Sequence, residues 1–88
     1  MLSRKTAIEK VAAFLLASAE WAGRADRFDL PMARGDIADY LGLTIETVSR
    51  TMTKLVEAGV IQLPTPQHVQ VLDAAELRAL ALPEAESL

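Results

Sequence analysis

The sequence ARGDIADYLGLTIETVSRTMTKLVEA, residues 33–58, holds two stretches of helical periodicity with a glycine between them. The first stretch runs from Ala33 to Leu41. Its apolar residues share one face of a helix and are Ile37, Ala38 and Leu41, whereas Arg34, Asp36 and Asp39 are expected to face outward. Gly42 then suits the left-handed position that follows the end of a helix. The pattern therefore predicts a short helix that stops at this glycine.

The second stretch predicts a longer helix over residues 45–58, with Thr44 as its N-cap and Gly59 after its end. Its apolar side is formed by Val48, Met52, Leu55 and Val56. Its opposite side carries Glu46, Ser49, Arg50, Thr53, Lys54 and Glu57. Two helices joined by about three residues, with a glycine in the connection, are typical of a helix-turn-helix. We assign this motif to residues 33–58.

The residues before the motif predict another amphipathic helix and a short extended segment. Ser3 is a plausible N-cap, and the helix should end near Gly23. Its apolar face consists of Ile8, Val11, Ala12, Leu15, Leu16 and Ala19. Phe28 and Leu30 alternate with Asp29 before a proline, which favours an extended segment that packs these apolar residues under the next helices.

After Gly59 the periodicity falls to two, which predicts a β-hairpin over residues 60–72. Pro64 and Pro66 are assigned to its turn because proline cannot donate a hydrogen bond to a sheet. Asp73 can cap a final helix that ends at Pro83, before a C-terminal tail of residues 83–88. The predicted fold is mainly α: a winged helix-turn-helix domain over residues 1–82, with a three-helix core and residues 60–72 as the wing.

Composition excludes several classes of function. The 88 residues include no cysteine, so disulfides, thiolate catalysis and cysteine-bound metals are excluded. His68 is the only histidine, and a lone imidazole makes neither a catalytic triad nor a metal site. The carboxylates are spread over separate helices, and there is no glycine-rich phosphate loop. We therefore expect no enzyme activity, metal, cofactor or small-molecule ligand. No stretch resembles a signal peptide or a membrane span, and the expected location is the cytoplasm.

The net charge of −3 is unevenly distributed along the chain. Residues 73–88 hold four carboxylates and one arginine, which accounts for −3, whereas residues 1–72 hold eight basic and eight acidic residues. A neutral body argues against avid nonspecific binding to nucleic acid, but it permits a small local contact patch.

The outward face of the second helix has two interpretations. It is either a solvated face with a Glu46–Arg50 pair worth a few tenths of a kcal/mol, or a surface that contacts DNA. The second helix of a helix-turn-helix enters the DNA major groove with its first turns. This position favours double-stranded DNA as the partner.

Each outward side chain suits a particular contact with DNA. Arg50 can bond to both acceptors of guanine, Glu46 can accept from cytosine while orienting Arg50, and Ser49 can touch a neighbouring base edge or a thymine methyl. The candidate contacts with the DNA backbone are Arg34, Thr44, Thr47, Thr53 and Lys54. Thr44 is equally explained as a helix cap.

The segment RGDIADYLGLTIETVSRTMTKLVEAGVI, residues 34–61, closely resembles the DNA-binding domain of the Crp-Fnr family of bacterial transcription regulators, particularly its FixK and Fnr branch. The resemblance implies a homodimeric activator or repressor that recognises a palindrome with TTGA-like half-sites. It implies that Arg50 reads guanine, Glu46 the paired cytosine and Ser49 a thymine. RNA polymerase is a further candidate partner.

The sequence also departs from the family. The effector domain and the dimerisation helix of whole members are expected to be absent from this chain. Ala33 stands where related sequences often place a capping Ser or Thr, and residues 60–72 contain no Lys or Arg. Only Gln67 or His68 could then provide polar contacts from the wing. These features keep open an alternative, in which the winged helix is a protein–protein interaction module.

Overall fold

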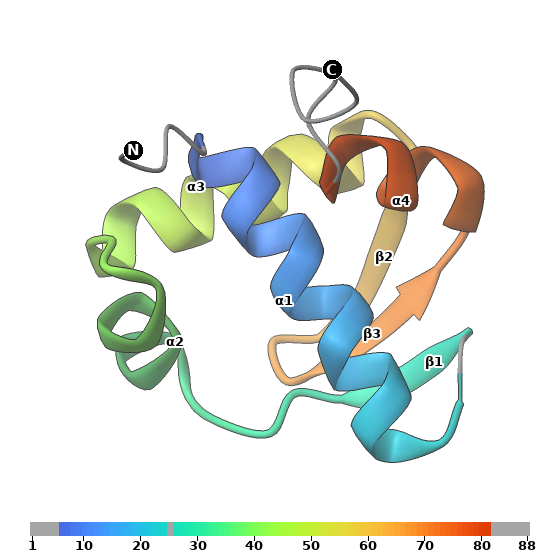
Figure 1. Ribbon diagram of the computed structural model, residues 1–88, viewed down its shortest axis with the longest axis horizontal. Coiled ribbons are helices and arrows are strands. Elements are labelled where there is room, and N and C mark those ends of the chain that lie inside the picture. Colours follow the sequence, from blue (N-terminus) through green and yellow to red (C-terminus); the bar gives the residue numbers. More distant parts are fainter. Residues whose placement is uncertain (1–5, 25, 82–88) are drawn as a thin grey trace, which may run out of the picture.

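The computed structural model describes residues 6–24 and 26–81. In chain order its elements are α1 (Ala7–Ala22), β1 (Arg27–Asp29), α2 (Arg34–Leu41), α3 (Ile45–Glu57), β2 (Ile61–Thr65), β3 (His68–Val71) and α4 (Ala74–Ala81). The helix α1 crosses the molecule diagonally, with α2 on one side and the sheet and α4 on the other (Figure 1). The predicted fold class, a mainly helical winged helix-turn-helix, is confirmed.

The start of α1 differs from the prediction. Its N-cap is Thr6 and not Ser3, which lies outside the described residues. The Thr6 hydroxyl accepts from the Glu9 backbone N–H at 3.3 Å, and the Glu9 carboxylate accepts from the Thr6 N–H at 2.7 Å. This reciprocal pair is a capping box. Because Ser3 has no Glu or Gln three residues later, it cannot form the same pair. The predicted end at Gly23 is confirmed.

The helix-turn-helix has the predicted connection. Gly42 ends α2 with a left-handed φ of 72°, and the Leu43 N–H donates to the Ala38 carbonyl at 2.8 Å. The Thr44 hydroxyl accepts from the Thr47 N–H at 3.1 Å and so caps α3. α3 ends at Glu57, one residue earlier than predicted. The N-cap of α2, Ala33, makes no side-chain hydrogen bond.

The hydrophobic core lies where α1 packs against α3, α4 and β1. Its largest fully buried side chains include Leu15, Ile37, Met52, Leu55, Ile61 and Leu77. On α3 the buried stripe is Val48, Thr51, Met52 and Leu55. Val56, predicted to be in the core, is 36% exposed, whereas Thr51 is only 5% exposed. The buried residues of α3 follow one another at spacings of three, one and three. Val56 comes directly after Leu55, so its side chain is rotated about 100° around the helix from that of Leu55 and leaves the buried stripe.

The two strands of the wing share their sheet with a third strand, β1, from outside residues 60–72. The sheet order is β1-β3-β2 with antiparallel pairing, and Phe28 of β1 lies opposite Val69 of β3. The predicted extended segment is therefore part of the sheet, and its Phe28 and Leu30 are buried as expected. Pro64 was predicted to lie in the turn, but it belongs to β2, where the register shifts between Gln62 and Thr65. An edge strand tolerates proline at such an irregularity.

The last helix begins as predicted, because the Asp73 carboxylate accepts from the Glu76 N–H at 3.0 Å. Leu77 is fully buried against the core. Pro83 and the predicted tail, residues 83–88, lie outside the described residues. Within the described part of the chain, none of the helices has the length and apolar character that crossing a membrane requires.

Candidate nucleic-acid interface

The outward strip of α3 is defined here as Glu46, Ser49, Arg50, Thr53 and Lys54, and all five residues are exposed. The opposite side of the helix is fixed in the core, with Val48 and Leu55 fully buried and Met52 1% exposed. The strip therefore projects from a helix whose position is set by packing. This arrangement lets its side chains contact a partner without any rearrangement of the backbone.

Glu46 and Arg50 do not form the predicted ion pair. The ion pair among the described residues is Arg24 with Asp26, and His68 Nδ1 makes a hydrogen-bond contact with Asp29. An exposed pair gains little Coulomb energy in water and costs side-chain entropy. In the unbound domain, Glu46 therefore does not hold the Arg50 guanidinium, and both charges are available to a partner.

The hydroxyl groups near the strip differ in whether they already donate a hydrogen bond within the protein. Thr44 Oγ1 donates to Thr47 Oγ1 at 2.8 Å while it caps α3, and Thr53 Oγ1 donates to the Ser49 carbonyl at 3.1 Å. The Ser49 hydroxyl makes no hydrogen bond within the described residues. Ser49 and Thr47 can therefore donate to DNA without losing a hydrogen bond within the protein. Thr44 and Thr53 would first have to break the hydrogen bond that each hydroxyl already donates.

Arg34 is not the outward residue that the sequence predicted. It is half-buried at the start of α2, and its Nη1 atom is buried without a hydrogen-bond partner in the described structure. Burial lowers the pKa of Arg34 because a charged guanidinium is less well solvated there. A phosphate cannot reach the buried Nη1 atom where it lies, so a contact between Arg34 and DNA requires the guanidinium to turn outward.

Ile45 is a surface residue that the sequence reasoning missed. It is the first residue of α3 and is 53% exposed, next to Glu46 and one turn before Ser49. Its Cδ1 atom lies about 3.4 Å from where a Cβ on Gly35 would be, so it also covers the start of α2. Its position four residues before Ser49 places it on the same face of the helix, and this spacing is the sequence signal that would have identified it. An exposed apolar side chain here suits a thymine methyl.

The wing offers fewer free polar groups than α3. His68 Nδ1 lies 2.9 Å from Asp29 Oδ1, and the Gln67 carbonyl accepts from the Leu30 N–H at 2.7 Å. The Thr65 hydroxyl accepts from two backbone N–H groups of the turn. The bonds of His68 and of the Gln67 carbonyl join the end of the wing to the segment around β1, and those of Thr65 close the turn. The Gln67 side-chain amide makes no hydrogen bond within the described residues.

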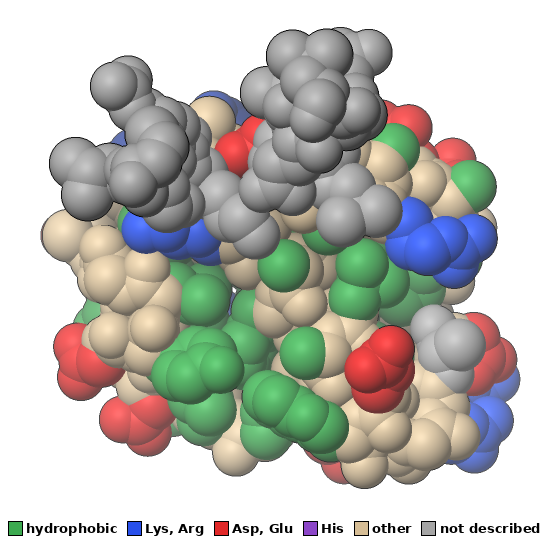
Figure 2. All heavy atoms as spheres, in the orientation of Figure 1, with side chains coloured by type: hydrophobic (Ala, Val, Ile, Leu, Met, Phe, Trp, Pro, Cys, Tyr) green, Lys and Arg blue, Asp and Glu red, His purple; other side chains and the backbone are tan. Residues whose placement is uncertain are grey.

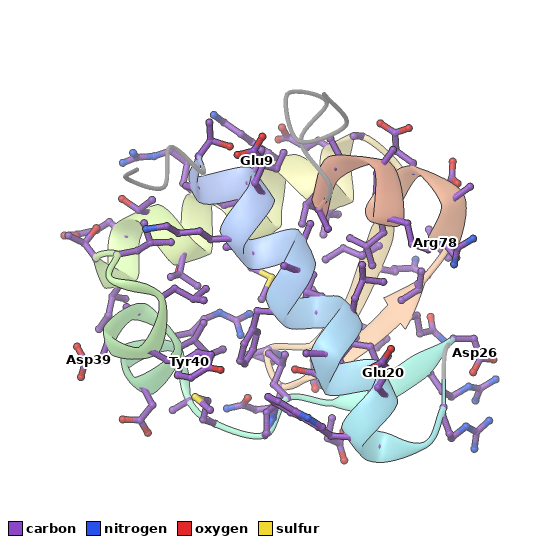
Figure 3. The ribbon with its side chains drawn as sticks, viewed as in Figure 1. Glu9, Glu20, Asp26, Asp39, Tyr40 and Arg78 are labelled. Carbon is purple, nitrogen blue, oxygen red and sulfur yellow. The ribbon has the colours of Figure 1, made fainter. Side chains whose placement is uncertain are left out.

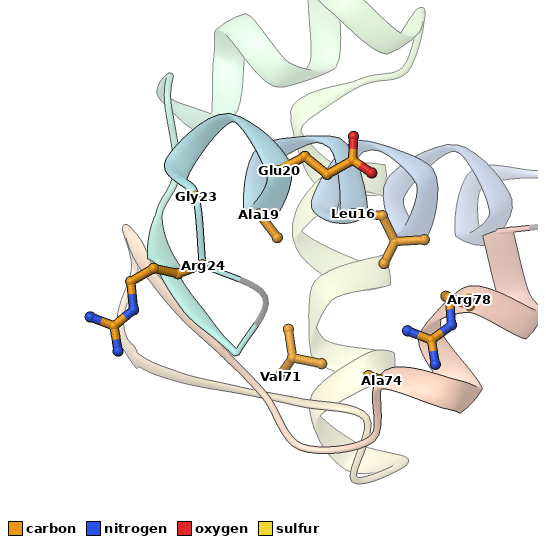
Figure 4. Close-up of a pocket in the computed structure, with 8 residues that line it drawn as sticks. All are labelled: Leu16, Ala19, Glu20, Gly23, Arg24, Val71, Ala74 and Arg78. Atoms are coloured by element: carbon orange, nitrogen blue, oxygen red, sulfur yellow. The ribbon is translucent and has the colours of Figure 1, made fainter.

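Hollows also lie elsewhere on the described surface, and we consider two of them. One, of about 390 Å³, lies between α1, the end of β3 and the start of α4, and Arg78 and Glu20 lie at its rim (Figure 4). The second lies between α1 and α2. The described residues include no group of three or more potential metal ligands. The exposed strip of α3 is thus the best-defined candidate site.

Comparison with known proteins agrees with this geometry. Residues 9–80 match the Crp-like helix-turn-helix domain. The nitrogen fixation regulation protein FixK of Bradyrhizobium diazoefficiens is 53% identical over 85 residues, which cover 92% of this chain and 35% of that protein. FixK of Rhizobium meliloti is 46% identical over 80 residues, which cover 91% and 38%. These residues thus span little more than a third of either relative.

A solved structure gives the same answer for the fold. FixK2 from Bradyrhizobium japonicum superposes with a TM-score of 0.85 at 40% identity, covering 93% of this chain and 41% of that one. The matched relatives are named as regulators and transcriptional activators, not as enzymes. The chain therefore belongs to the Crp-Fnr family of transcription regulators, as one of its helix-turn-helix DNA-binding domains.

Proposed function

We propose that this domain recognises a specific DNA sequence by inserting the first two turns of α3 into the major groove. The observation that supports the proposal is the exposure of Arg50, together with Glu46 and Ser49, on a helix whose other side is fully buried. A helix-turn-helix presents this part of its second helix to base edges. Because Arg50 makes no ion pair within the described structure, its guanidinium needs no release before it binds.

Within this proposal the half-site resembles TTGA. Arg50 donates to O6 and N7 of the guanine, Glu46 accepts from N4 of the paired cytosine, and Ser49 contacts a thymine. A carboxylate on a DNA surface repels phosphates, so its presence beside an arginine favours base recognition over a general backbone contact. Glu46 would orient Arg50 only once both groups are at the base pair.

The proposed contacts with phosphates come from the edges of the same surface. Lys54 lies further along α3 and is exposed, and Thr47 retains a hydroxyl proton to donate. Arg34 is a proposed contact from the start of α2, and its guanidinium would have to turn outward first, because its Nη1 atom is buried. Thr44 and Thr53 are weaker candidates, because each hydroxyl already donates within the protein.

A single domain should bind its half-site weakly. We propose a homodimer, in which two copies of α3 enter major grooves about one helical turn apart. Linking two such domains raises the effective concentration of the second contact and so raises the affinity for the whole palindrome. RNA polymerase is a further proposed partner.

The test is a binding comparison between this chain and its Arg50→Ala variant. Fluorescence anisotropy is measured with a duplex that contains TTGA and with duplexes in which the G·C pair is replaced by each other pair. The wild-type chain should prefer the G·C pair by about 1–3 kcal/mol, and Arg50→Ala should remove that preference. Thermal unfolding should be unchanged, because Arg50 is exposed and makes no internal bond.

Lys54→Ala is the matched control on the same helix. It should weaken binding to every duplex by a similar factor and reduce the slope of affinity against salt by about one phosphate contact. If Arg50→Ala keeps the wild-type base preference, the proposed recognition is wrong. If the wild-type chain itself has no preference among the duplexes, the protein–protein interaction alternative becomes the better account.

A further inference from the structure

The hollow between α1 and α2 is an aromatic groove of about 320 Å³, close to the lower end of the range for ligand pockets. We define the aromatic groove by Ala13, Phe14, Ala17, Trp21 and Tyr40, with Lys10 at one end. The small alanines of α1 form its floor. Phe14 packs edge-on against Trp21, with ring centroids 6.3 Å apart, and lies 5.8 Å from Tyr40.

The aromatic side chains of this groove are unusually open to solvent. Trp21 is 60% exposed and Tyr40 is 64% exposed, whereas Phe14 between them is buried. Hydrophobic side chains gather on this face along α1 and toward α2 (Figure 2). Clustered exposed aromatic residues of this kind are characteristic of contact surfaces, because they offer a large apolar area at a small cost in side-chain entropy.

Exposed carboxylates flank the aromatic groove, whereas Lys10 is the charged residue among those that line it. Glu20 precedes Trp21 on α1, and Asp39 adjoins Tyr40 on α2; Figure 3 shows the two carboxylates on opposite sides of Tyr40. Asp36 lies one turn before Tyr40, and all three carboxylates are exposed and make no ion pair within the described part of the chain. The Lys10 ammonium donates to the Leu41 carbonyl at 3.1 Å.

We propose that the aromatic groove binds a polypeptide segment that presents arginine or lysine next to aliphatic side chains. The aliphatic residues would fill the hollow, and the cations would stack on Trp21 or Tyr40 beside Glu20 and Asp39. The carboxylates that flank the groove repel phosphates, which favours a cationic peptide over DNA or an anionic lipid as the occupant. The hollow at the start of α4 has no aromatic residue in its lining, so it offers a cation no ring on which to stack.

This surface is separate from the proposed DNA contact. α1 packs against the buried side of α3, so the outward strip of α3 faces away from α1. A peptide in the groove and a duplex on α3 can therefore bind the same domain together. The proposal does not depend on sequence recognition by Arg50 and can fail independently of it.

Trp21 is the only tryptophan of the chain, so its fluorescence reports on the groove. The probes are two short amphipathic peptides with the same leucines, one with arginine and one with glutamate at the intervening positions. The arginine peptide should shift the Trp21 emission in a saturable way and move the NMR amide signals of Ala13 and Ala17. The glutamate peptide should do neither. Rising salt should weaken the arginine complex.

Variants separate the apolar and the ionic contributions. Glu20→Gln and Asp39→Asn should each weaken the arginine peptide about two- to fivefold, which is the effect of losing one exposed ion pair. Glu57→Gln removes an exposed carboxylate from α3 and should change nothing. Ala17→Gln should fill the floor and abolish binding while the helix remains intact. A TTGA duplex should bind all four variants like the wild-type chain.

Three results would overturn the proposal. The first is equal binding of both peptides, and the second is NMR shifts confined to residues outside the groove. The third is a Trp21 emission that changes with protein concentration when no peptide is present, because it would identify a second copy of the chain as the occupant.

Discussion

The outward strip of α3 and the end of the wing are both polar, but their polar groups are used differently. On α3 the Arg50 and Glu46 side chains make no ion pair, and the Ser49 hydroxyl makes no hydrogen bond within the described structure. In the wing, His68 is bonded to Asp29, and Thr65 accepts two backbone bonds. Folding leaves the proposed base-contacting groups of α3 free, whereas at the end of the wing it uses Thr65 and His68 and leaves the Gln67 amide free.

This difference shows why polarity alone does not identify a binding surface. A polar group that is already hydrogen-bonded within the protein must break that bond before it contacts a partner, and the exchange of one bond for another gains little free energy. A group that is paired only with water has no such internal bond to lose. The proposed DNA recognition should therefore be concentrated on α3, and the wing should contribute little.

Among the variants that test the difference between α3 and the wing, Glu46→Ala is expected to have the largest effect on DNA binding. The variant should lose about 1–3 kcal/mol of discrimination at the cytosine, because no acceptor remains for N4. Its affinity for unrelated duplexes should rise, since one charge that repels phosphates is gone. Anisotropy titrations against the same set of duplexes measure both changes.

Glu57→Ala is the control for Glu46→Ala, because it removes an exposed carboxylate from the far end of the same helix. It should leave the base preference unchanged. If both variants alter the base preference equally, the change comes from the loss of one negative charge at any position on α3. Glu46 then does not recognise a base.

A smaller effect is expected at Ile45. If its side chain contacts a thymine methyl, replacing that thymine by deoxyuridine should weaken binding of the wild-type chain about fourfold, the value of one methyl group removed from water. Ile45→Ala should bind more weakly to the thymine duplex and lose its sensitivity to the replacement. Affinities for the four combinations form a double-mutant cycle. A coupling of zero at every thymine of the half-site would contradict the contact.

Local signals made most of the backbone predictable. Gly42 and Thr44 specify the turn of the helix-turn-helix, since a left-handed glycine and a capping hydroxyl each act within a few residues. Asp73 likewise caps α4 as predicted. The exposed strip of α3 also followed from periodicity, because a helix with one buried side must expose the other.

The errors arose where distant residues decide the structure. β1 is a strand because β3 lies beside it, and sequence patterns contain no information about that pairing. Pro64 fits in β2 because the register shifts there. Arg34 is half-buried because of tertiary packing around the start of α2. The Glu46–Arg50 pair was predicted from spacing, but spacing permits such a pair without making it stable.

The smallest effect should come from the wing. Asp29→Asn removes the carboxylate that bonds His68, and the loss of one exposed pair should lower the free energy of unfolding by at most about 1 kcal/mol. Affinity for the TTGA duplex should change by less than about twofold, because no wing group that contacts DNA is lost. Gln67→Ala, in the same turn, keeps the bond to Asp29 and provides the control. A tenfold fall in affinity for either variant, with the fold intact by circular dichroism, would mean that the wing contacts the DNA backbone. The contrast with α3 would then be wrong.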